Sequence, residues 1–116
     1  MTQPVEPYQA EAAVADASTC PQGQCQFTFP PVPAKKRLQL TSVSAQLGPA
    51  ADTIVLEGEV SYFVTKSNSA LGYLTQVVSF FYEPGSTPTA RVFVGPNYKQ
   101  HTSLIITLVG VLGPAS

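Results

Sequence analysis

The stretch TIVLEGEVSYFV, residues 53–64, decides the fold because its side chains alternate in character at every second position. One parity is apolar, whereas the other is mostly polar or acidic. The apolar set is Ile54, Leu56, Val60, Tyr62 and Val64. A period of two residues is that of a β-strand with one buried face. The pattern predicts one long strand with a bend at Gly58.

The same alternation recurs on both sides of this stretch. Further strands are expected at residues 24–29, 37–47, 71–83, 90–94 and 101–112. In 37–47 the apolar parity changes after Leu40, which predicts a β-bulge near Thr41 or Ser42. The segments between the strands are too short for helical crossovers, so the strands must pair antiparallel. We therefore expect an all-β fold, an antiparallel β-sandwich or jelly roll of six to seven strands.

The first 19 residues differ from the rest of the chain. They combine Pro4 and Pro7 with acidic residues and several alanines, and they contain few bulky apolar side chains. This composition predicts an extended N-terminal arm, residues 1–19, attached to a single β-sandwich domain, residues 20–116. Whether the arm lies on its own domain or on a neighbouring copy stays open.

Charge is scarce in this sequence. Charged residues make up 11% of the 116 residues and the formal net charge is −1, whereas a typical globular domain is about 25% charged. Binding to nucleic acid needs several cations and is not expected. The one basic cluster, residues 35–37, is interpreted as the guard of a strand edge. The longest apolar run, residues 104–112, is about half the roughly 20 residues of a membrane-spanning helix, so no membrane span is expected.

Cys20 and Cys25 enclose a short segment that contains Pro21 and Gly23. Proline and glycine favour a tight turn, so the spacing predicts a small disulfide loop at the entrance of the first strand of the domain. Two free thiols in a reducing compartment are the alternative. Residues 1–19 lack the basic start and apolar middle of a signal peptide, which fits a mature exported form or a protein that is never exported. The disulfide favours an extracytoplasmic location: secreted, periplasmic or at the cell surface.

Reactive side chains are few. His101 is the single histidine and begins a predicted strand, followed by Thr102 and Ser103. A hydroxyl residue adjacent to it points to the opposite face of the strand and makes no dyad, so His101 is interpreted as a surface or hydrogen-bonded structural residue. Glu57 and Glu59 are two residues apart on the predicted strand, which places their side chains on one face about 7 Å apart. Paired carboxylates serve glycosidases or bind calcium, but this face is expected to meet water. Without a phosphate loop, nucleophile elbow or zinc motif, we expect no enzyme, cofactor or metal.

Tyrosines are the side chains best suited to recognition. Tyr62 and Tyr73 fall in predicted strands and Tyr98 falls in a predicted loop. Exposed tyrosine stacks on sugar rings or fills protein interfaces. These three are therefore the candidate ligand or interface residues, with filling of ordinary strand positions as the alternative.

The segment FTFPPVPAKKRL, residues 27–38, resembles small exported bacterial β-sheet proteins of unassigned function. Those proteins have a similar strand, a proline–alanine turn and a basic residue that enters the next strand. The likeness continues through residues 41–45 and 104–112. The resemblance implies export and a β fold, and it supplies no catalytic residue.

Three functions follow as hypotheses. The first is a non-enzymatic extracytoplasmic structural or assembly protein that contacts copies of itself, by exchange of the arm or a strand, or through the two-sided apolar strands at 71–82 and 104–112. A capsid-like role is a variant of this hypothesis that also fits a jelly roll. The second is a module that binds carbohydrate or another ligand. The third is a glycosidase-like enzyme that uses Glu57 and Glu59.

Overall fold

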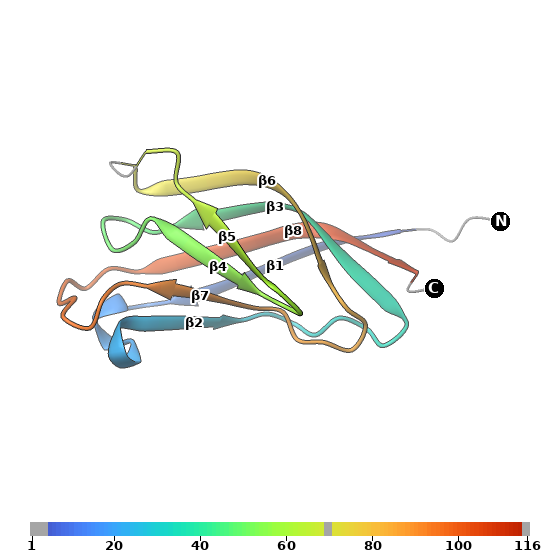
Figure 1. Ribbon diagram of the computed structural model, residues 1–116, viewed down its shortest axis with the longest axis horizontal. Coiled ribbons are helices and arrows are strands. Elements are labelled where there is room, and N and C mark those ends of the chain that lie inside the picture. The colour runs from blue at the N-terminus through green and yellow to red at the C-terminus, as the bar shows by residue number, and fades with distance from the viewer. Residues whose placement is uncertain (1–4, 69–70, 115–116) are drawn as a thin grey trace.

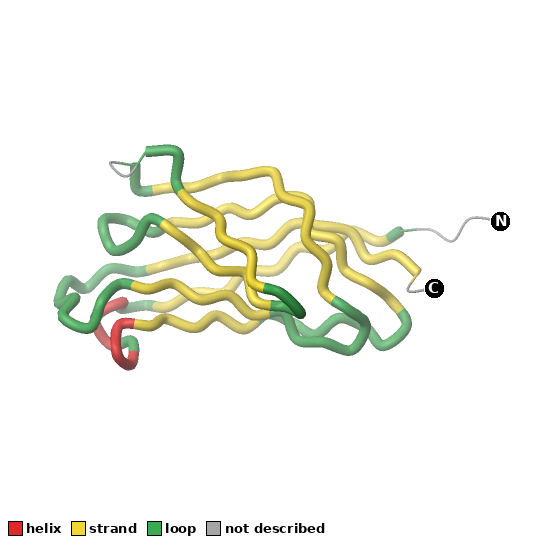
Figure 2. Tube along the Cα trace, viewed as in Figure 1, coloured by secondary structure: helices red, strands yellow, loops and turns green. Residues whose placement is uncertain are grey.

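The chain forms two four-stranded antiparallel sheets packed face to face (Figure 1). The computed structural model describes residues 5–68 and 71–114. Two short 3-10 helices, η1 and η2, lie together at one end of the strands (Figure 2). The elements are β1 (Glu6–Val14), η1 (Ala17–Thr19), η2 (Pro21–Gly23), β2 (Gln24–Thr28), β3 (Lys36–Gln46), β4 (Thr53–Glu57), β5 (Ser61–Thr65), β6 (Tyr73–Tyr82), β7 (Thr89–Phe93) and β8 (Leu104–Pro114).

The strand order is that of a jelly roll. One sheet has the order β1-β8-β3-β6 and the other has the order β2-β7-β4-β5. The strands pair in a nested series, β1 with β8, β2 with β7, β3 with β6 and β4 with β5. A long antiparallel ribbon wound over on itself gives this series. Successive pairs of the ribbon alternate between the layers: β1 with β8 and β3 with β6 lie in one sheet, and β2 with β7 and β4 with β5 lie in the other. The predicted all-β sandwich is confirmed, with eight described strands in place of the six to seven expected.

The core lies between the sheets and is made by alternate residues of each strand. In β8 every second residue from Leu104 to Leu112 is buried, and in β3 the inward set changes parity between Leu40 and Val43. Burying each large aliphatic side chain stabilises the fold by about 1.5–3 kcal/mol. The largest fully buried side chains are Tyr82, Phe27, Phe29, Leu38, Leu40, Leu47, Ile54, Leu56, Leu104, Ile106, Leu108 and Val43.

Residues 53–64, predicted as one strand, form a hairpin instead. β4 ends at Glu57 and β5 begins at Ser61, and the Gly58 N–H donates to the Val60 carbonyl oxygen at 3.1 Å to close the turn. In this hairpin Leu56 pairs with Tyr62, so paired residues have the same parity. Period two therefore continues through the turn unchanged, and the alternation alone does not distinguish a bent strand from a hairpin.

The predicted N-terminal arm is also different in the structure. Residues 6–14 form the edge strand β1, which pairs with β8 along its whole length, from Glu6 opposite Leu112 to Val14 opposite Leu104. The Tyr8 hydroxyl donates to the Pro30 carbonyl oxygen at 3.3 Å. The inward residues after Tyr8 are mostly alanines, whose small side chains gave a weak apolar signal in the sequence. Residues 1–4 of the predicted arm and 115–116 of the predicted domain lie outside the described residues.

The predicted bulge is present in the region where β3 pairs with its two neighbours, β6 and β8. The register of β3 against both β6 and β8 shifts between Leu40 and Ser42. Gly110 of β8 is the register partner of Leu40, and a Cβ atom at Gly110 would lie 2.2 Å from the Gln39 carbonyl oxygen. The close approach of these two backbones therefore requires glycine at position 110.

Gly110→Ala should destabilise the fold by about 2 kcal/mol or more, because the methyl group must displace backbone in the centre of a sheet. Gly113→Ala is the matched control on the same strand, since the added Cβ would meet Val5 at an ordinary 3.7 Å. Urea unfolding of both variants measures the difference. Equal stability of the two variants would contradict this reading of the bulge.

Candidate functional site

The three candidate tyrosines lie in different surroundings. Tyr62 is half-buried on β5, with its ring centroid 5.6 Å from that of Phe80. Tyr73 is 70% exposed at the start of β6. Tyr98 is half-buried in the loop before β8, and its hydroxyl lies 2.6 Å from the Thr102 hydroxyl. Two strands of different sheets and a loop do not make one aromatic platform, so the carbohydrate hypothesis loses the feature on which it depended.

The two carboxylates of the glycosidase hypothesis line an open hollow of about 500 Å³. Glu57 ends β4, whereas Glu59 lies in the turn that follows, so they are not on one strand face as predicted. The Glu57 carboxylate lies 3.5 Å from the Arg91 guanidinium. Tyr82, at the wall of the hollow, donates its hydroxyl to the Thr89 carbonyl oxygen at 3.1 Å, and burial raises its pKa. The contacts in this hollow hold β4, β6 and β7 together.

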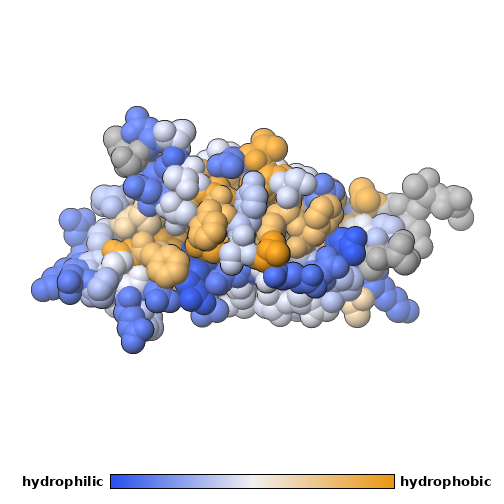
Figure 3. Space-filling view, in the orientation of Figure 1, coloured by the Kyte–Doolittle hydropathy of each residue, from blue (hydrophilic) through white to orange (hydrophobic). Residues whose placement is uncertain are grey.

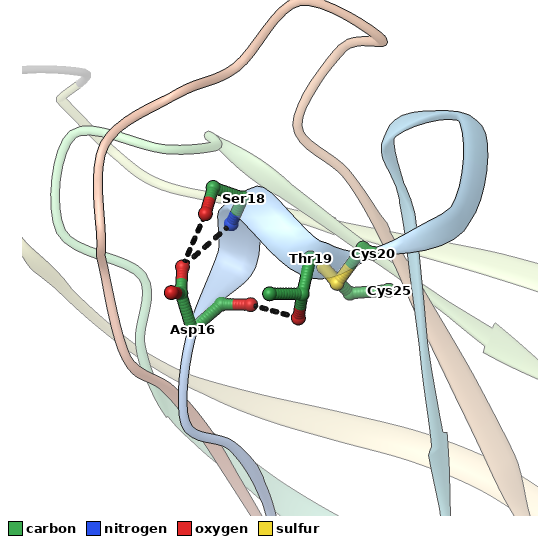
Figure 4. The surroundings of a disulfide bond; sticks show 5 residues. All are labelled: Asp16, Ser18, Thr19, Cys20 and Cys25. Carbon is green, nitrogen blue, oxygen red and sulfur yellow. Dashed lines mark hydrogen bonds between the residues drawn. A yellow bond between two sulfur atoms is a disulfide. The ribbon is translucent and has the colours of Figure 1, made fainter.

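Asp16, Ser18 and His101 meet where the chain leaves one sheet for the other. The Asp16 carboxylate caps η1 by accepting from the Ser18 N–H at 2.9 Å, and it also accepts from the Ser18 hydroxyl at 2.6 Å (Figure 4). Its second oxygen lies 2.6 Å from His101 Nδ1. The Ser18 hydroxyl, and next the His101 ring, hold the pKa of Asp16 below its ordinary value.

These residue types are those of a hydrolytic triad, but their geometry is not. In a triad the carboxylate and the serine contact opposite ring nitrogens of the histidine. Here Asp16 and Ser18 both approach Nδ1, at 2.6 Å and 3.4 Å, and the serine hydroxyl is bound to the carboxylate. The cluster fastens η1 to the loop before β8, together with the bond from the Ala17 N–H to the Thr102 carbonyl oxygen at 2.7 Å. The sequence favoured a surface or hydrogen-bonded structural role for His101. It gave no sign of the contact with Asp16, because 85 residues separate the two.

The predicted disulfide joins Cys20 and Cys25 in the same corner (Figure 4). It encloses η2, and Cys25 lies in β2, fully buried. The bond therefore fixes the connection by which the chain passes from β1 in one sheet to β2 in the other.

The basic cluster at residues 35–37 is largely neutralised. Lys36 forms an ion pair with Glu6 of β1. Arg37 forms one with Glu83 at 3.0 Å and lies over the Phe81 ring, 5.9 Å from its centroid. These contacts agree with a role at strand ends and leave little positive charge for a phosphate backbone.

Exposed hydrophobic side chains gather at one side of the sandwich. Of the eight large hydrophobic residues that are exposed in the described part of the chain, six lie between residues 60 and 81. We call these six the β5–β6 edge, because β5 and β6 are the last strands of their sheets on that side. Figure 3 shows hydrophobic side chains over β5 and at the upper margin by β6. The β5–β6 edge comprises Val60, Phe63, Leu71, Tyr73, Val77 and Phe81.

The opposite side of the sandwich has a different composition. β1, the edge strand there, carries Glu6, Pro7 and Glu11, all exposed. Charged residues and proline are the usual means by which proteins keep edge strands from pairing with other chains. β6 has none: its sequence is YLTQVVSFFY.

Residues 5–68 and 71–114 contain no group of three or more His, Cys, Asp or Glu side chains arranged to hold a metal ion. In the same residues no helix has the length and apolar character needed to cross a membrane.

Comparisons with known proteins find similarity among solved structures alone. No protein-family model matches the chain, and no curated protein matches it. Among solved structures, the chain is similar to the virus-like particle of the extra small virus of the giant freshwater prawn Macrobrachium rosenbergii. The TM-score is 0.43 at 16% sequence identity, over 94% of this chain and 78% of that chain. The strand order described above stands independently of this similarity.

Replacing Cys20 and Cys25 together by serine should lower the free energy of unfolding by about 2 kcal/mol, the loop-entropy value for so short a loop. Chemical unfolding with and without dithiothreitol measures this. Reductant should lower the stability of the wild-type chain and leave the double variant unchanged. The prediction would be contradicted if reductant left the free energy of unfolding of the wild-type protein unchanged.

Asp16 should make the stability of the fold depend on pH in the acid range. Because its pKa is lower in the folded chain, its contribution is complete above its unfolded value, about pH 4, and is lost as the pH falls through the folded value. The difference in melting temperature between wild type and Asp16→Asn should therefore shrink between about pH 6 and about pH 2. Ser18→Ala, which removes the largest cause of the shift, should weaken this dependence. A difference that stays constant across that range would refute the assignment.

Proposed function

We propose that this chain is a non-enzymatic structural subunit that assembles with copies of itself through the β5–β6 edge. The observation that carries the proposal is the concentration of exposed hydrophobic side chains there. Single exposed hydrophobic residues are normal on a protein surface. Six at one side, with Val77 83% exposed and Tyr73 70% exposed, favour a surface that a partner covers.

The low charge of the chain supports self-association. At a net charge of −1 the repulsion between two copies is small. Exchange of the N-terminal segment between copies has less support than a surface contact, because β1 already pairs with β8 of its own chain.

The polar clusters support a role without catalysis. The residues nearest to a catalytic pattern, Asp16, Ser18 and His101, bond to one another in an arrangement that secures the crossover between sheets. Glu57 is engaged by Arg91. Each cluster has a structural explanation.

An extracytoplasmic location is part of the proposal. Disulfides persist in oxidising compartments and are rare in the cytosol. The Cys20–Cys25 bond, and the resemblance of residues 27–38 to exported proteins, support this location.

Light scattering tests the assembly. The average mass of the wild-type chain should exceed that of a single chain and rise with concentration. Phe63→Lys with Val77→Lys places one charge on each sheet at the β5–β6 edge and should return the mass to that of one chain. Gln9→Lys with Thr28→Lys adds the same charges at the opposite side, on exposed positions, and should leave assembly intact. A wild-type chain that stays a monomer at high concentration would overturn the proposal.

A further inference from the structure

β6 has a free edge, and the strand is irregular between Val77 and Phe80, where its register against β3 shifts. Among the described residues it pairs with β3 only, and it closes one side of the sheet β1-β8-β3-β6. In an antiparallel strand, alternate residues turn their N–H and C=O groups toward each side. About half of the backbone groups of this ten-residue strand therefore face outward from the sheet without a strand to receive them.

The outward side chains of β6 form a series whose chemical types are symmetric about its centre. Tyr73, Thr75, Val77, Ser79 and Phe81 are all exposed, and they run aromatic, hydroxyl, β-branched, hydroxyl, aromatic. Val77 is the centre of this series. If a second β6 runs antiparallel with Val77 opposite Val77, Tyr73 meets Phe81 and Thr75 meets Ser79, so each residue faces one of its own kind. Aromatic pairs and hydroxyl pairs are favourable cross-strand neighbours.

The strand itself carries no charge that would oppose this pairing, and the nearest exposed carboxylate beside it is Glu59 of the β4–β5 turn, which lines a hollow with Ser79 and Phe81. β6 contains no charged residue, and the nearest charged groups at its end, Arg37 and Glu83, are already paired with each other at 3.0 Å. Val77 is 83% exposed, so its side chain is free to meet a partner without rearranging the core.

From these observations we infer that β6 pairs antiparallel with β6 of a second copy, about a twofold axis at Val77. The occupant is a second copy because the series is complementary to itself, whereas an unrelated strand has no reason to match it. Such a contact is the same patch on both chains and closes as a dimer. It joins two four-stranded sheets into one continuous sheet. The inference rests on the proposed function and specifies the contact that the proposal requires.

Cysteine cross-linking tests the register. With Val77 on the axis, two Val77→Cys side chains face each other with Cβ atoms about 4.5–5.5 Å apart, within reach of a disulfide. Thr75→Cys is the matched control: its counterpart lies four residues further along the partner strand, about 13 Å away, which is too far to bridge. Thr75→Cys with Ser79→Cys restores a facing pair. The native cysteines are bonded to each other and do not interfere.

Mild oxidation should convert most of the Val77→Cys variant to covalent dimers. The double variant with Thr75→Cys and Ser79→Cys should behave in the same way. The single variant Thr75→Cys should form few covalent dimers. If the wild-type chain assembles but Val77→Cys does not cross-link, or Thr75→Cys cross-links equally well, the β6 contact is wrong while the proposed function stands. If the wild-type chain is a monomer by light scattering at the concentration used, both fail.

Discussion

The pairing of β3 with β8 across the middle of one sheet is the contact on which the rest of the structure depends. It runs from Lys36 opposite Pro114 to Gln46 opposite Ile105, and it joins segments far apart in the sequence. β1 and β6 are added to its two sides, and the chain between β3 and β8 supplies most of the second sheet. The bulge opposite Gly110 is the point where this pairing tolerates no added side chain.

A sandwich of this kind leaves two edge strands on each sheet. The edge strands at the two sides of this sandwich differ in their residues. At β1 acidic residues and a proline discourage further pairing. At β6 the backbone is open and the side chains are uncharged. Backbone groups of the kind that hold β3 to β8 are thus available at β6 to a further strand. The proposed structural role depends on this feature of the fold.

Residue types alone are a poor guide to chemistry in this chain. Asp16, Ser18 and His101 lie close together, yet the serine is bonded to the carboxylate and both contact one ring nitrogen. Glu57 and Glu59 line one hollow, yet Arg91 engages the first and the second lies in a turn. In both places hydrogen bonds and ion pairs join elements that are distant in sequence, and their effect is to hold the corners of the sandwich.

The sequence by itself determined the all-β class, the bulge near Thr41, the short disulfide loop and the apolar character of 71–82, because each depends on neighbouring residues within one segment. Only the tertiary structure decided that residues 53–64 turn back at Gly58, since the hairpin preserves the parity on which the prediction depended. It also decided that the alanine-rich segment 6–14 is a strand, because small side chains become apolar contacts only once β8 lies beside them. The order of the strands, and with it the open edge at β6, comes from long-range pairing that no local pattern encodes.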